Sequence, residues 1–272
     1  MLPNQRVQRT HSRVTSRAKG ARAAPRGAPL TRSVDRTDRG MNNPDERRCV
    51  YCGAGEPLTQ DYVPPKCLFP EPRPSRLITV TSCLRCNLDS STHDEYLRTM
   101  LAMRADLSGN PAVLSIRQKA VRSFERPSQA KFRDAFNRSM KRVLLYGPDG
   151  APVVDHQTYG VSLDRICWVV ARTTAGLHAT LKGTLSPADT HHVGANLATE
   201  VDFERNEVLA WGRAQLFKAP EITIAPGVYS YRVAGVSFDP NCTVWWHTFY
   251  SAVEFVALVM PKQVEAPVPR AG

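Results

Sequence analysis

Cys49-Val-Tyr-Cys52-Gly53 and Cys83-Leu-Arg-Cys86-Asn87 are the two stretches that decide the fold, with 30 residues between Cys52 and Cys83. Each C-x-x-C pair lets two thiolates reach one metal ion, and two pairs supply the four sulfurs of a tetrahedral zinc site. Gly53 suits the tight turn that follows the first pair. The sequence therefore predicts a structural zinc ion held by Cys49, Cys52, Cys83 and Cys86.

The segment between the pairs is rich in proline and poor in bulky apolar residues, so zinc binding would have to stabilise it, by about 10 kcal/mol. The chain has seven cysteines, an odd number, and no apolar signal segment precedes them. This usage favours metal binding in a reducing compartment, and we expect a cytoplasmic protein. Cys67 is predicted to be a partly buried thiol near the module, and Cys167 and Cys242 to be core residues.

The composition is that of a globular protein of 272 residues, with 42% hydrophobic residues. The longest apolar stretch, 243–260, contains His247 and Glu254 and is rich in strand-forming residues. It fits a buried sheet better than a bilayer span. We therefore expect no membrane partner.

Most of the net charge of +11 lies in residues 1–40, which hold ten basic and two acidic residues, a net of +8. Residues 41–272 carry the remaining +3. The tail lacks the apolar content needed to fold. Four interpretations stay open: a basic arm for nucleic acid, a mitochondrial-type presequence, a solvated tail without a role, or an untranslated stretch preceding a start at Met41.

Residues 93–148 are predicted to be helical. Thr92-His93-Asp94-Glu95 matches a capping box, with Thr92 as the N-cap. Pro111 is expected at the first position of a second helix, which Pro127 ends. A third helix is marked by apolar residues spaced by four, Phe132, Phe136 and Met140.

Residues 149–272 are predicted to form an α+β domain. A turn at 147–150 joins the strands of a hairpin, and a helix runs from Ser162 to Gly176. Strands follow at 221–224, 228–237, 243–249 and 254–260. The expected fold class is α+β: a basic tail (1–40), a four-cysteine zinc module (41–92), a helical segment (93–148), and an antiparallel sheet with a helix against it (149–272).

Three features of the sequence resemble HNH endonucleases. They are the two cysteine pairs, the segment Asp61-Tyr62-Val-Pro-Pro-Lys66 between the pairs, and the segment Asp94-Glu-Tyr-Leu-Arg98 after them. The resemblance is closest to bacterial HNH-like proteins and covers residues 49–107. It implies a ββα-metal, or treble-clef, finger with structural zinc. It also implies phosphodiester hydrolysis at one divalent metal, Mg²⁺ or Mn²⁺.

That resemblance makes Asp61 a metal ligand and Asn87, at a helix start, a second ligand or a phosphate-positioning group. Tyr62 occupies the position of the general-base histidine. With an ordinary pKa of about 10, a tyrosine is a far weaker base near neutral pH than a histidine. The candidate catalytic residues are therefore Asp61, Tyr62 and Asn87, and the site is degenerate.

Other titratable residues give weaker signals. His93, Asp94 and Glu95 could complete a metal site or simply favour a helix N-terminus. His191 and His192 are adjacent, so in a strand they would point to opposite faces, and without a third ligand nearby we expect them in a solvated loop. His178 and His247 give no signal.

Residues 117–142 hold nine basic and two acidic residues, a net of +7. Arg117, Arg122, Lys131 and Arg138 are the predicted nucleic-acid-binding residues. Three functions stay open: an HNH-type endonuclease, a non-catalytic zinc module that binds nucleic acid or protein, and a finger that supports an interaction surface on the sheet domain. DNA is favoured over RNA as the partner.

Overall fold

The computed structural model describes residues 48–55, 57–146, 149–182, 191–203, 207–236 and 239–262. Residues 43–272 form one compact unit, and the predicted tail, residues 1–40, lies outside the described residues. The fold is α+β with antiparallel sheets and a four-cysteine cluster near its N-terminal end, as predicted. No described helix is both long and apolar enough to cross a membrane.

The N-terminal module consists of an antiparallel hairpin followed by a long helix. Strand β1 (Leu58–Tyr62) pairs with β2 (Thr79–Cys83), with a short 3-10 helix, η2 (Lys66–Leu68), between them. Helix α1 (Leu84–Met103) starts directly at the second cysteine pair. The predicted capping box at Thr92 is therefore wrong, because Cys83 is the N-cap and its sulfur accepts a hydrogen bond from the Cys86 amide at 3.4 Å.

Helices α2 (Pro111–Phe124) and α3 (Ala130–Ser139), joined by the 3-10 helix η3 (Pro127–Gln129), form the helical segment. Pro111 is the first residue of α2, as predicted, and the Asn110 side chain caps it. Rings of Phe124, Phe132 and Phe136 meet edge-on with centroids 5.3–6.4 Å apart. This aromatic cluster fixes α3 against α2.

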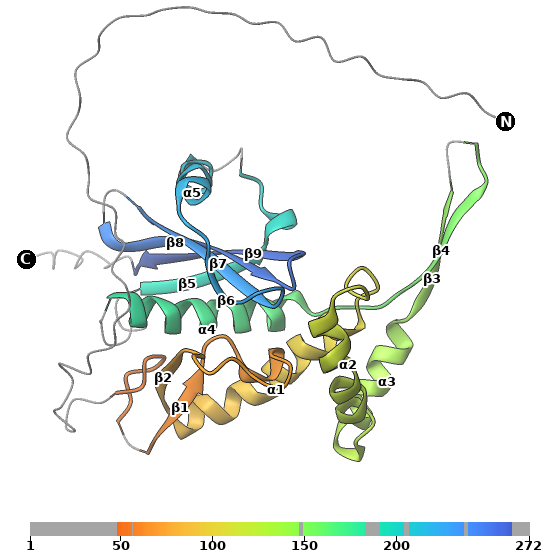
Figure 1. The fold of residues 1–272 in the computed structure, drawn as a ribbon, viewed down its shortest axis with the longest axis horizontal. Helices are drawn as coiled ribbons and strands as arrows, with labels where there is room; N and C mark the ends of the chain where they lie inside the picture. Colours follow the sequence, from red (N-terminus) through yellow and green to blue (C-terminus); the bar gives the residue numbers. More distant parts are fainter. Residues whose placement is uncertain are drawn as a thin grey trace, which may run out of the picture. The chain divides into compact units, whose positions relative to one another are not determined.

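A two-stranded antiparallel hairpin, β3 (Lys141–Tyr146) and β4 (Pro152–Thr158), follows α3. Figure 1 shows it extending away from the remaining elements. It is the hairpin predicted around the turn at 147–150, of which residues 147 and 148 lie outside the described part.

The C-terminal sheet has five antiparallel strands in the order β5-β9-β8-β7-β6. Four of its strands lie where strands are predicted: β6 (Ile222–Ala225), β7 (Tyr229–Val236), β8 (Asp239–Phe249) and β9 (Val253–Pro261). The fifth, β5 (His191–Leu197), is not predicted by the sequence analysis. A 3-10 helix, η5 (Ala198–Glu200), follows β5. Helix α4 (Leu163–Lys182) lies along one face, and α5 (Glu207–Lys218) on the other (Figure 1).

Alternation along β8 and β9 divides the sheet residues between two cores. Trp245 and Phe255 belong to the large core, whereas Val244 and Val256 pack with Leu216 of α5. Because α4 also contacts the N-terminal module, the large core is continuous from that module to the sheet.

Helix α4 begins directly after Ser162, as predicted, but continues past Gly176 to Lys182. Gly176 does not end the helix. A Cβ at Gly176 would lie 2.6 Å from Cγ1 of Val63, so glycine permits the close approach of α4 to the segment after β1.

Two histidines that give no signal in the sequence are fully buried between α4 and the sheet. His247 Nε2 lies 2.9 Å from Thr174 Oγ1, and its Nδ1 lies 2.7 Å from the Tyr229 hydroxyl. Burial lowers the pKa of His247 to about 3, so the ring is neutral. His178 Nδ1 lies 3.1 Å from Thr243 Oγ1.

Candidate metal centre and the buried cluster beside it

The four predicted cysteines converge. The ligand atoms of Cys49, Cys52, Cys83 and Cys86 all lie within 4.8 Å of one another, and the Cys52 and Cys83 sulfurs are 3.7 Å apart. Tetrahedral zinc with Zn–S bonds of about 2.3 Å places its sulfurs about 3.8 Å apart. The donor set and its spacing therefore fit the predicted ion.

Backbone geometry explains how the pairs are held. Gly53 adopts a φ of 70° and donates its amide to the Cys49 carbonyl at 2.8 Å, closing the first knuckle. The Val50 amide donates to the Thr81 carbonyl at 3.0 Å, which joins this knuckle to β2. Burial alone would raise the pKa of the Cys49 thiol, but backbone hydrogen bonds at Cys83, Tyr51 and Cys52 outweigh it and lower the pKa to about 7. These backbone hydrogen bonds favour the thiolate of Cys49, which is the form that binds metal.

The remaining cysteines lie outside the centre. Cys67 is partly exposed, and its thiol lies 3.5 Å from the Asp94 carbonyl. Cys242 is buried, as predicted for a core residue, whereas Cys167 is only partly buried.

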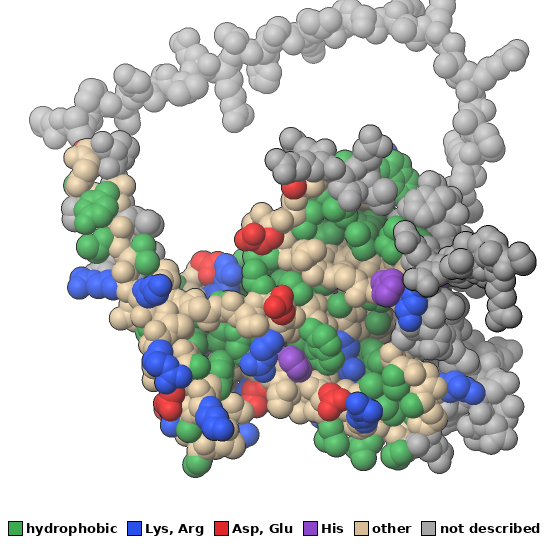
Figure 2. Space-filling model, turned by 180° about the vertical axis from the view of Figure 1, so that it is seen from behind, with side chains coloured by type: hydrophobic (Ala, Val, Ile, Leu, Met, Phe, Trp, Pro, Cys, Tyr) green, Lys and Arg blue, Asp and Glu red, His purple; other side chains and the backbone are tan. Residues whose placement is uncertain are grey.

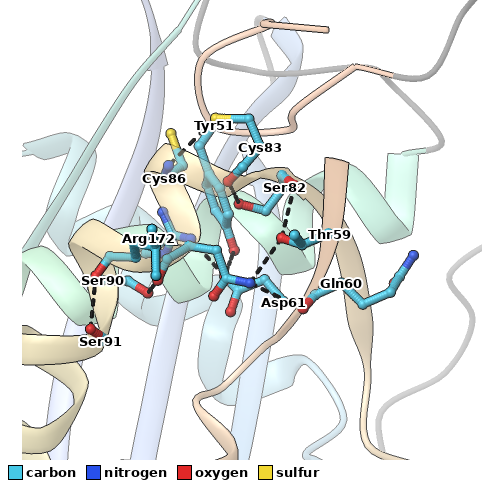
Figure 3. A network of polar contacts seen from close by, with 12 residues as sticks. Tyr51, Thr59, Gln60, Asp61, Ser82, Cys83, Cys86, Ser90, Ser91 and Arg172 are labelled. Atoms are coloured by element: carbon cyan, nitrogen blue, oxygen red, sulfur yellow. Dashed lines mark hydrogen bonds and ion pairs between the residues drawn. The ribbon is translucent and has the colours of Figure 1, made fainter. Parts of the chain in front are cut away.

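Asp61, the predicted metal ligand, is engaged by protein groups. Its Oδ2 accepts hydrogen bonds from Arg172 Nη2 at 2.7 Å and from the Tyr51 hydroxyl at 2.8 Å. Figure 3 shows the Asp61 carboxylate facing these two side chains. The Arg172 guanidinium also stacks on the Tyr51 ring, 3.5 Å from its centroid. The Asp61 and Arg172 side chains are only 11% and 9% exposed, so this ion pair is buried.

Asn87 lies in the first turn of α1, as the resemblance implies, but it serves to join α1 to β1. Its Nδ2 donates to Thr59 Oγ1 at 2.9 Å and to the Gln60 carbonyl at 3.4 Å. Tyr62 is the last residue of β1, and the ammonium of Lys66 lies 5.3 Å from its ring centroid.

Asp94 is the unusual member of this neighbourhood. Burial raises its pKa from 3.8 to about 7, and the charge of Asp61 adds to the effect. Its buried Oδ1 has no hydrogen-bond partner among the described residues. A protonated carboxyl is the form that this environment favours.

The space enclosed by these side chains is too small for a water molecule. Its lining includes Tyr51, Asp61, Asp94 and Arg172. A hydrated Mg²⁺ or Mn²⁺ does not fit there in this conformation. In the described part of the chain, the four cysteines are the one cluster of three or more Cys, His, Asp or Glu side chains placed to hold a metal ion.

Helix α4 closes the site along one helical face, through residues spaced by three or four. Arg165 donates to the Thr92 carbonyl at 3.0 Å, and the Trp168 ring lies 4.7 Å from that of His93. Arg172 and Gly176 continue this face, which lies against β1 and α1.

The other predicted acidic and histidine candidates have structural partners. Glu95 pairs with Arg98 at 3.1 Å and accepts from Gln129 at 3.3 Å. Burial, with the charge of Arg165 as a second cause, lowers the pKa of His93. The solvated loop expected at His191 and His192 is wrong, because both residues lie on β5, with His191 half-buried and His192 exposed.

The predicted nucleic-acid residues divide into two kinds. Arg122, Lys131 and Arg138 are exposed and make no ion pair within the described residues. Arg117 is half-buried, and its guanidinium donates to the Ala102 carbonyl at 2.8 Å. Arg117 therefore stabilises the end of α1 as well as adding charge.

Sequence reasoning missed Tyr51, Arg165 and Arg172. The sequence does contain an indication that Arg172 has a buried partner, because it is the one charged residue in the run 166–178 of an apolar helix.

Comparison with family models, curated proteins and solved structures finds no match for this chain.

Proposed function

We propose that this chain is a nucleic-acid-binding protein built on an HNH-like zinc module that does not cut its ligand. The observation that carries the proposal is the 2.7 Å ion pair between Arg172 and Asp61. In an HNH-type site, the equivalent carboxylate would bind the divalent metal that stabilises the phosphate's developing charge. Here a cation of the protein holds that carboxylate.

Two further observations support loss of cleavage. The cavity that Asp61 shares with Tyr51, Asp94 and Arg172 has no room for water, and hydrolysis needs both a metal and an attacking water. Tyr62 has the position that the resemblance gives to the general-base histidine, and a phenol cannot replace an imidazole in that role. Zinc at the four cysteines would then serve to hold the hairpin and α1 together.

The binding surface that we propose is the basic face of α2 and α3. Its exposed basic residues outnumber Glu125 and Asp134, the two acidic residues of the segment: Lys119, Arg122, Arg126, Lys131 and Arg138. Lys119 pairs with Glu71 at 3.6 Å. Figure 2 shows Lys and Arg side chains over this part of the molecule. Such a surface binds a polyanion by releasing its condensed counterions.

The test is fluorescence anisotropy with duplex DNA, and then RNA, over a series of salt concentrations. Replacing Arg122, Lys131 and Arg138 with Glu should weaken binding at least about tenfold. It should also reduce the slope of log binding constant against log salt concentration by about three. The control reverses three exposed arginines elsewhere, Arg76, Arg85 and Arg213, and alters net charge equally. Equal losses in both variants, or no binding at low salt, would refute the proposed surface.

Cleavage is tested separately with plasmid and single-stranded substrates in Mg²⁺ or Mn²⁺. We expect no nicking above background. Nicking by the natural chain that a chelator abolishes and that Asp61→Ala removes would show a working nuclease site.

A further inference from the structure

The β3–β4 hairpin does not pack against any other helix or strand that the structure describes. Its strands pair with each other and make no extensive contact with any other described element. An isolated two-stranded hairpin is at best marginally stable in water. Leu144 and Tyr146 on β3 are nevertheless 43% and 63% exposed. Both facts indicate that the hairpin packs against something else.

The base of the hairpin is fixed, so the hairpin projects in a defined direction. The Gly160 amide donates to Ser139 Oγ at 2.9 Å, which joins the two ends of the hairpin. The Tyr159 ring lies 4.9 Å from that of Phe136, and its hydroxyl donates to the Met100 carbonyl at 3.1 Å. From this base, the six residues of β3 reach about 20 Å.

A largely apolar groove of about 610 Å³ opens at that same base. Val161 and Leu163 line it and are 42% and 39% exposed, and Met100, Leu101 and Phe255 lie deeper. The groove also includes Gln157, Thr158 and Tyr159, the last residues of the hairpin and its anchor. An exposed apolar strand thus begins beside an open apolar groove.

We propose that the occupant of this groove is the hairpin of a second copy of the chain. Two copies related by a twofold axis, with their hairpins antiparallel, bring the outer end of each hairpin to the base of the other. Leu144 and Tyr146 of each copy then meet Val161 and Leu163 of its partner. Such an interface is isologous and closes at two subunits.

Charge favours a protein occupant over a nucleic acid for this element. Residues 141–158 hold two basic and two acidic residues, so the hairpin itself is electroneutral, unlike the basic helices that precede it. Lys141 lies at its base and Asp149 beyond the end of β3, both exposed. The antiparallel arrangement brings each Asp149 toward the Lys141 end of the other copy, which is attractive.

The first experiment measures the mass of the full chain by sedimentation over a range of concentrations. We expect a dimer. Leu144→Asp and Tyr146→Asp on the hairpin, and Leu163→Asp in the groove, should each raise the dimer dissociation constant at least about tenfold. Leu114→Asp is the matched control, since this leucine of α2 is 49% exposed and should tolerate the change without loss of dimer.

The second experiment identifies the contact. Tyr146→Cys and Val161→Cys proteins are mixed and oxidised, and a disulfide between the two different chains is the expected product. A monomer at every concentration would overturn the proposal, as would a dimer that the three variants leave intact. Cross-linking of Tyr146→Cys only to itself would mean that hairpins pair without the groove. A monomer whose DNA affinity falls with Tyr146→Asp would assign the hairpin to nucleic acid instead.

Discussion

Arg172, in the middle of α4, donates from Nη2 to Oδ2 of Asp61 on β1 at 2.7 Å, across 111 positions of sequence. The pair joins the sheet domain to the four-cysteine module at the point where the HNH resemblance implies a catalytic metal. It has two consequences. The module and the sheet depend on each other for stability, and Oδ2 of the carboxylate already accepts from two protein donors.

Removing one member of this pair should be costly. Arg172→Gln leaves the Asp61 carboxylate buried without its counter-ion, and we expect a loss of about 3 kcal/mol in the free energy of unfolding. Asp61→Asn combined with Arg172→Gln removes both charges and should recover more than half of that loss. Urea denaturation gives the free energy of unfolding of the natural chain, the single variant and the double variant.

The Arg104–Asp106 pair supplies the control, since its side chains are 40% and 56% exposed with the shortest contact at 2.6 Å. Arg104→Gln should cost less than about 1 kcal/mol, because water screens an exposed pair. A cost for Arg172→Gln as small as this one would mean that the Asp61 pair contributes little to holding α4 in place.

Zinc content gives the second prediction. The purified chain should contain about one zinc per molecule, and Cys83→Ser should reduce this content and lower the melting temperature. Cys83 is the informative ligand because it is also the N-cap of α1. Cys167→Ser, outside the centre and partly buried, is the control and should retain zinc. Full zinc content in Cys83→Ser would rule out the four-cysteine centre.

The parts of the fold that the sequence predicts are those set by local pattern. The two C-x-x-C pairs predict which four cysteines come together, because the spacing of metal ligands can be read directly from the sequence. The turn around 147–150 and the β-branched residues of β6 to β9 gave the hairpin and the sheet strands. Pro111 gave the start of α2, since proline is tolerated there and not inside a helix.

The parts that the sequence did not predict depend on contacts between distant segments. The capping box at Thr92 is a local pattern and predicts the wrong start for α1, because Cys83 caps the helix through the cysteine centre. Gly176 predicts a helix end, yet in the structure it permits the close approach to Val63. The role assigned to Asp61 could not include Arg172, since nothing in the spacing of either residue predicts that α4 lies over β1.

Asp94 gives a prediction on pH. Its folded pKa is about 7, above the ordinary value of 3.8, so between these values the folded chain binds a proton that the unfolded chain does not. The stabilisation is full below about pH 4 and is lost as the pH rises through 7. The Asp94→Asn variant does not lose this stability as the pH rises. Its melting temperature should be about 5 °C above that of the natural chain at pH 8 and close to it near pH 4.

The comparison must be made between the two proteins at each pH, because His247 acts in the opposite direction. Its pKa is lowered by burial from 6.5 to about 3, so it removes stability as the pH falls. Both proteins share that effect, and it cancels in the difference. A melting-temperature difference that stays constant from pH 4 to pH 8 would show that Asp94 does not titrate in this range.

The last prediction concerns whether the candidate active site can be restored by a base alone. In an open HNH-type site, replacing Tyr62 with a histidine supplies a general base, typically worth about 100-fold or more in rate. Here Oδ2 of Asp61 accepts from Arg172 and Tyr51, and the cavity that these three side chains line has no room for water. Tyr62→His should therefore give no cleavage of plasmid or single-stranded DNA with Mg²⁺ or Mn²⁺, and Tyr62→Phe serves as its control. Cleavage that appears with Tyr62→His and disappears on adding Asp61→Ala would mean that α4 opens in solution and that a metal replaces the Arg172 guanidinium on Asp61.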